Sequence, residues 1–169
     1  MIETNFIISQ ILILTAMFFD FFSMQFKNRK QIFSILAISA TLISLHYLLL
    51  NKKLAALIIS FSIIRFIVCI FTINKKNLFI FLGINVTILL FNITSYQEFL
   101  LIVGLSIFIT GNFQRNKRKM RLQMITGTSL IIIYNISIFT PAGILTETIF
   151  LMGQIRGYLK NKHKNKIKT

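Results

Sequence analysis

Long runs of apolar residues, separated by short polar connectors, extend along the whole chain. A helix that crosses a bilayer needs about 20 mostly apolar residues, with a range of about 17–25. Runs of this length without strict alternation are typical of helices, which satisfy their own backbone in lipid. The pattern predicts seven spans, at 6–26, 31–50, 54–73, 78–93, 99–113, 120–139 and 143–159. We therefore expect an all-α, polytopic helix bundle that forms one integral membrane domain, residues 1–169.

The composition favours the same class of protein. Of the 169 residues, 55% are apolar and only 14% are charged, whereas about 25% of a soluble domain is charged. These residues supply too little polar surface for a globular domain that is soluble in water. A soluble enzyme, a secreted disulfide scaffold and a disordered chain are therefore excluded.

The net charge of +15 predicts an orientation in the membrane rather than nucleic-acid binding. With seven spans, alternate connectors lie on the same side. One side then carries most of the basic residues, namely Lys27, Arg29, Lys30, Lys75, Lys76, Arg115, Lys117, Arg118, Lys119, Arg121, Arg156 and the lysines from Lys160 to Lys168. The other side carries Lys52 and Lys53 with Glu3 and Glu98. The positive-inside rule places the N-terminus outside and the C-terminus in the cytoplasm.

The basic tail at 160–169 has two interpretations. It is an orientation signal by the same rule, and its lysines would also attract anionic lipid at about 1 kcal/mol per charge.

The spacing of the runs suggests three helices, a linker helix and three more helices. The repeat-like units would be 6–73 and 97–159, with the linker helix at 78–93. An offset of 89 residues aligns Gln25 with Gln114, Arg29 with Arg118, Lys30 with Lys119, Ser39 with Thr128, His46 with Asn135 and Arg65 with Gln154. Such a plan would give both units the same orientation, as in some transporters. Apolar helices also align by chance, so duplication and coincidence both stay open.

Three charged residues, Asp20, Arg65 and Glu147, lie inside predicted spans. Each costs about 2.5–3.5 kcal/mol near the bilayer centre on insertion scales, so such residues usually face the bundle interior or a cavity. Asp20 and Arg65 lie roughly 9 and 12 Å from the inner ends of their spans at about 1.5 Å per residue. Their similar depth makes a pair feasible, which would either line a pathway or only fix helix packing.

A second group of polar residues lies towards the outer ends of the spans. His46, Asn135 and Glu147 could converge there on one polar site. Gln154 projects from the seventh span in the same direction as Glu147, and Gln10 lies in the first span. The alternative is interhelical hydrogen bonding, typically worth about 0.6–2 kcal/mol per contact. With Asp20 and Arg65, these residues form our candidate solute pathway.

The sequence lacks the motifs of known catalytic sites, such as HExxH, GxSxG or a P-loop. Two histidines and one cysteine do not make a convincing zinc site. We therefore expect neither enzyme activity nor a metal or cofactor.

The sequence resembles the YgjV-type family of bacterial inner membrane proteins. The resemblance rests on His46-Tyr47-Leu48-Leu49-Leu50 followed by Arg65, on Tyr134-Asn135 followed by Ala142-Gly143, Glu147 and Arg156, and on Gln10. It covers about residues 8–160 and implies an inner membrane location, but no established activity. A more distant similarity is to SWEET and PQ-loop transporters, which share the plan of three, one and three helices. Those proteins use helix prolines as hinges, whereas Pro141 is the only proline here.

Two functions are compatible with these features. One is a small-solute transporter or transporter-like protein, with its pathway between the two units. The other is a non-transporting scaffold or accessory subunit, in which the polar residues only hold helices together. The lipid bilayer is the partner that both require. The substrate, the coupling ion and assembly into a homo-oligomer stay open.

Overall fold

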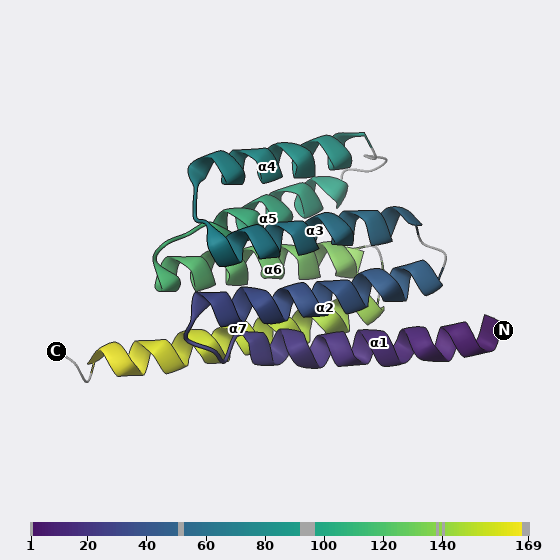
Figure 1. Cartoon of the computed structure of the whole chain (residues 1–169), viewed down its shortest axis with the longest axis horizontal. Helices are drawn as coiled ribbons and strands as arrows, with labels where there is room; N and C mark the ends of the chain where they lie inside the picture. Colours follow the sequence, from purple (N-terminus) through teal and green to yellow (C-terminus); the bar gives the residue numbers. More distant parts are fainter. Residues whose placement is uncertain (1, 51–52, 92–96, 138, 140, 167–169) are drawn as a thin grey trace. The chain divides into compact units, whose positions relative to one another are not determined.

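The computed structural model describes residues 2–50, 53–91, 97–137, 139 and 141–166. Within these residues it contains seven α-helices and no strand, which confirms the all-α prediction (Figure 1). The helices are α1 (Ile2–Ser23), α2 (Arg29–Leu49), α3 (Lys53–Phe71), α4 (Lys75–Leu90), α5 (Gln97–Asn112), α6 (Lys117–Ser137) and α7 (Pro141–Lys166). Pro141 begins α7, where its missing amide hydrogen costs nothing.

The chain divides into two compact units, Met1–Thr72 and Ile73–Thr169. In the first unit, α1 packs on α2 and α2 packs on α3. In the second unit, α4 packs on α5, α5 on α6 and α6 on α7. The helix expected as a linker therefore belongs to the second unit. The segment expected as a basic tail begins as helix, because α7 continues to Lys166.

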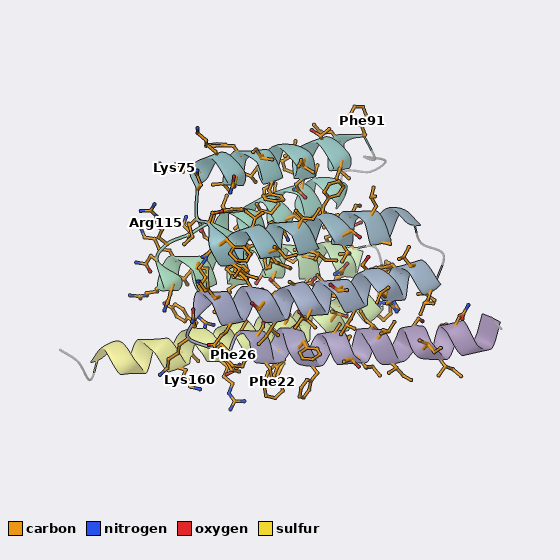
Figure 2. All side chains as sticks on the ribbon, in the orientation of Figure 1. Phe22, Phe26, Lys75, Phe91, Arg115 and Lys160 are labelled. Carbon is orange, nitrogen blue, oxygen red and sulfur yellow. The ribbon has the colours of Figure 1, made fainter. Side chains whose placement is uncertain are left out.

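Four helices have the apolar character expected of membrane spans. Asn5–Ser23 and Arg29–Leu49 are long and apolar enough to cross a bilayer, judged by length and composition. Ala56–Phe71 and Phe99–Asn112 are apolar but shorter. In the second unit, Lys75, Arg115 and Lys160 lie at one end of the helices and Phe91 lies at the opposite end (Figure 2).

Three helices begin in the same way, with an asparagine followed by two basic residues. The side-chain oxygens of Asn28, Asn74 and Asn116 accept hydrogen bonds from the backbone amide two residues later, at 3.1, 3.1 and 2.9 Å. Such a cap satisfies one of the amides that a helix start leaves without a partner. Basic residues that we expected in connectors therefore lie in the first turns of α2, α4 and α6.

The α1–α2 and α5–α6 turns make the same backbone hydrogen bonds 88 residues apart. In each bond below, an amide donates to a carbonyl three or four residues earlier. The first turn has Gln25 to Phe22, Phe26 to Ser23 and Ile32 to Asn28, and the second has Phe113 to Thr110, Gln114 to Gly111 and Met120 to Asn116. The caps at Asn28 and Asn116 have the same spacing.

Burial of the side chains recurs with the same offset of 88 residues. The buried positions of the first unit that match are Ala16, Asp20, Ser23, Met24, Ile32, Phe33, Leu36, Ser39, Ala40, Arg65, Phe66 and Cys69. Their buried counterparts are Gly104, Phe108, Gly111, Asn112, Met120, Arg121, Met124, Gly127, Thr128, Gly153, Gln154 and Gly157. The offset of 89 instead places buried Phe33 and Phe66 opposite exposed Leu122 and Ile155. The alignment expected from matching residue types is therefore one residue too long.

The first two helices of each three-helix set cross at small residues. The Ser39 hydroxyl donates to the Ala16 carbonyl over 3.1 Å where α1 crosses α2. At the equivalent crossing of α5 and α6, a Cβ on Gly127 would lie 2.7 Å from the carbonyl oxygen of Gly104. Small residues allow this close approach of two backbones, as is common between membrane helices.

Candidate functional site

Asp20 lies on α1 inside the first unit, where its side chain is 9% exposed. Its carboxyl group lies beside the Ser39 hydroxyl of α2. The same hydroxyl donates to the Ala16 carbonyl. Asp20 therefore lies at the α1–α2 crossing, next to a hydroxyl group.

Arg65 lies on α3 of the same unit and is 7% exposed. Its Nη2 donates to the Ser62 hydroxyl over 3.2 Å, and its Cζ lies 5.0 Å from the centre of the Phe66 ring. The two charges whose similar depth made a pair feasible thus share a unit, but the contacts described for them are with different partners. Each has a serine beside it.

His46 and Gln10 meet at a third serine of the first unit. The Nδ1 of His46 lies 2.8 Å from the backbone carbonyl of Ser9. Because a carbonyl only accepts, Nδ1 is the protonated nitrogen. The amide of Gln10 donates to the Ser9 hydroxyl over 3.4 Å. The His46 contact joins α2 to α1, whereas the Gln10 contact lies within α1.

Asn135 and Glu147 lie on neighbouring helices of the second unit. A Cβ on Gly143 of α7 would lie 3.0 Å from the side-chain carbon and oxygen of Asn135, so this amide rests against α7. Glu147 lies one turn beyond Gly143 on the same helix face. The second unit therefore supplies two members of the predicted polar site, and His46 belongs to the first unit.

Gln154 also lies in the second unit, where it is fully buried. Its Nε2 donates to the hydroxyl of Thr128 over 2.9 Å and joins α7 to α6. Its Oε1 is buried and has no hydrogen-bond partner within the described part of the chain. Gln154 is thus a polar side chain that packing satisfies only in part.

Arg121 is a buried charge that the sequence analysis missed. Only 2% of it is exposed on α6, although we grouped it with the basic residues of a connector. The signal was present in the sequence, because the sixth predicted span already began at residue 120. A basic residue inside that boundary is expected to face protein.

One pair of equivalent positions carries aromatic rings in the first unit and polar groups in the second. Phe33 and Phe66 are in contact, with ring centres 5.9 Å apart. The residues 88 positions later are Arg121 and Gln154. Both pairs are buried.

Another pair of equivalent positions shows the reverse exchange. Phe108 and Phe150 of the second unit are in contact, with ring centres 6.0 Å apart. Asp20 and Ser62 lie 88 positions earlier. Each unit thus packs one aromatic pair where the other unit has polar groups. The packing of these helices therefore does not require polar groups at either pair of positions.

Comparison with known proteins identifies the family of the chain. No curated protein and no solved structure matches the chain, so the similarity to SWEET transporters stays a prediction. Among the described residues, no group of three or more His, Cys, Asp or Glu side chains could hold a metal ion. A family model described as a bacterial inner membrane protein matches residues 7–165, almost the whole chain. The chain therefore belongs to the YgjV family of bacterial inner membrane proteins, which confirms the resemblance noted in its sequence and the expected location.

Proposed function

We propose that this inner membrane protein is a small-solute transporter or transporter-like protein. In this proposal, α1–α3 and α5–α7 are two repeated units in the same orientation, joined by α4 within a bundle of seven spans. The common turn hydrogen bonds and the burial pattern at an offset of 88 residues support the repeat. Parallel repeats of three helices with one linker are a known transporter plan.

One observation supports the transport proposal. Buried charged residues of the first unit lie at positions where the second unit, 88 residues later, has an aromatic or small residue. Phe108 takes the position of Asp20, and Gly153 takes that of Arg65. A buried charge costs about 2.5–3.5 kcal/mol in a span, so a protein that needed only packing would gain from the apolar residue. The retained charges therefore favour a role in handling a polar solute.

The test replaces polar residues with those of the other unit. We expect Asp20→Phe combined with Ser62→Phe, and separately Arg65→Gly, to insert and fold but to lose at least tenfold of solute uptake. Uptake is measured in proteoliposomes with labelled phosphate, succinate, alanine and glucose. The matched control is Ile32→Met, which introduces the buried residue of the second unit at an apolar position. Unchanged uptake in the polar variants would remove these residues from the pathway.

The alternative is a scaffold or accessory subunit, and the interhelical hydrogen bonds favour it. The hydroxyls of Ser44 and Ser60 lie 3.0 Å apart across α2 and α3, and Gln154 joins α7 to α6. Cysteine scanning of α7, in a chain whose Cys69 has been replaced by Ala, separates the two functions. A membrane-impermeant thiol reagent should label the face of Gly143, Glu147 and Gln154 in a transporter. Protection of this face would favour the scaffold.

The proposed topology, with the C-terminus in the cytoplasm, has a separate test. Cations are unfavourable in the first turn of a helix because of its dipole. The basic residues in the first turns of α2, α4 and α6 nevertheless follow the caps at Asn28, Asn74 and Asn116, as an orientation signal would require. A reporter enzyme fused after Thr169 should be active in the cytoplasm. Activity in the periplasm would contradict seven spans in this orientation.

A further inference from the structure

Two arginines flank one pair of phenylalanine rings where α2 packs on α3. The Cζ of Arg29 lies 4.5 Å from the centre of the Phe33 ring, and the Cζ of Arg65 lies 5.0 Å from that of Phe66. The two rings contact each other at 5.9 Å with planes 33° apart. Stacking on a ring holds a guanidinium group in place. We call these four residues the arginine–phenylalanine cluster.

Cys69 lies beside both guanidinium groups. The Nε of Arg29 donates to the Cys69 carbonyl over 3.3 Å, and Arg65 lies one turn earlier on α3. One turn corresponds to about 6 Å along the helix, so Arg29 stands at the end of the unit and Arg65 stands deeper. Arg29 is half-buried and Arg65 is buried, which gives the cluster an entrance and an interior.

The charge of the cluster favours an anion. Arg29 lies in the first turn of α2, where the helix dipole adds positive potential, and Arg65 adds a second positive charge on the far side of the phenylalanine pair. The buried carboxyl group of this unit, Asp20, lies on α1 beside Ser39 of α2. A guanidinium group presents parallel donors that match the two oxygens of a carboxylate or phosphate. The second unit has Lys117 and Gly153 at the positions of Arg29 and Arg65, so packing of the shared helices does not require the cluster.

We propose that the arginine–phenylalanine cluster binds the carboxylate or phosphate group of a small anionic solute, which enters from the side of the membrane where α2 begins. If the anion is the substrate of the transporter, the site depends on the proposed function. Its binding is measured without transport. A phospholipid headgroup carries the same phosphate chemistry, so the test must separate the two sources.

The first measurement is the thermal unfolding midpoint of the full chain in phosphatidylcholine nanodiscs. Sodium phosphate or succinate should raise the midpoint saturably by several degrees beyond sodium chloride at the same ionic strength, because a ligand that binds the native state stabilises it. Arg65→Gln, Arg29→Gln and Arg29→Lys should each weaken the apparent affinity at least tenfold. Arg29→Lys keeps the positive charge but loses the parallel N–H donors of the guanidinium group. The control Lys30→Gln removes an exposed neighbouring charge and should change the affinity less than twofold.

The outcomes decide the proposal directly. No saturable shift with either anion would overturn it, and so would a loss in Lys30→Gln equal to that in Arg29→Gln, which would indicate diffuse surface charge. If Arg65→Gln fails to fold, the Arg29 variants decide alone. Phosphatidylglycerol in the nanodisc that abolishes the shift would overturn the solute in favour of a lipid headgroup. Saturable anion binding without uptake would support the anion site and contradict the transporter proposal. Uptake of glucose without anion binding would support the transporter and contradict the anion site.

Discussion

The set α1–α3 and the set α5–α7 have the same backbone pattern but differ in the chemistry of their interiors. Their turns, caps and buried positions recur 88 residues apart. The first set buries Asp20 and Arg65, whereas the second buries Arg121 and Gln154 at other equivalent positions. The difference teaches that local turn geometry and small residues at crossings determine this packing. The polar residues occupy positions that the other set fills with aromatic or small residues.

The largest effect is expected at the crossing of α5 and α6. A Cβ on Gly127 would lie 2.7 Å from the carbonyl oxygen of Gly104 and 2.8 Å from the backbone amide of Phe108. Backbone atoms at these distances must shift, so Gly127→Ala should lower the free energy of unfolding by about 1–3 kcal/mol. The measurement is the unfolding transition in mixed detergent micelles.

The matched variant in the first set is Ser39→Ala. Position 39 already carries a side chain, so this variant loses only hydrogen bonds, which are worth about 0.6 kcal/mol each between membrane helices. Equal losses in Gly127→Ala and Ser39→Ala would contradict the closer approach of the two backbones at Gly127.

A smaller effect is expected where Gln154 meets Thr128. Thr128→Val leaves the whole buried amide of Gln154 without this partner, which should cost about 1–2 kcal/mol. Gln154→Leu should cost less, because its Oε1 is buried without a hydrogen bond among the described residues. The double variant should then cost less than the sum of the single variants, as expected for contacting residues. Strict additivity would show that the two side chains contribute independently.

The sequence predicted the helices better than their register. Apolar runs and basic connectors were sufficient for seven helices. The expected start of the second span, residue 31, fell two residues late because hydropathy does not detect the cap at Asn28. The offset of 89 followed from matching Arg29 with Arg118, although Arg29 donates to a backbone carbonyl and Arg118 donates to a side-chain hydroxyl. Arg29 contacts Cys69, and Arg118 contacts Tyr158 forty residues further on.

The candidate site was predicted residue by residue, but its contacts were not. Asp20 and Arg65 are buried as expected from their cost in lipid, yet the partners described for them include serines, which hydropathy cannot rank as partners. Arg121 was missed because it was assigned by its neighbours in the connector rather than by its own position. The exchange of aromatic and polar pairs becomes visible only with the offset of 88 residues. That offset follows from the hydrogen bonds of the two turns, which the sequence alone does not give.

The two caps test whether the shared turns contribute equally. Asn28→Ala and Asn116→Ala each remove a side-chain bond to the amide two residues later, at 3.1 and 2.9 Å. Loss of an asparagine cap typically costs about 1 kcal/mol. Because Asn116 Oδ1 also accepts from the Lys119 amide at 3.3 Å, we expect the loss in Asn116→Ala, measured by chemical unfolding, to be at least as large as that in Asn28→Ala. A loss at only one turn would mean that the other turn is stabilised by contacts outside the shared pattern.

The smallest effect is expected at the link between α6 and α7. The Nε of Arg118 donates to the Tyr158 hydroxyl over 3.1 Å, and the bond is exposed. Because water replaces an exposed partner, Tyr158→Phe should cost less than about 0.5 kcal/mol. Arg118→Gln, the control from the other side of the bond, should lose somewhat more because it also gives up stacking on the ring at 5.9 Å. A loss above about 1 kcal/mol in Tyr158→Phe would show that this link is desolvated.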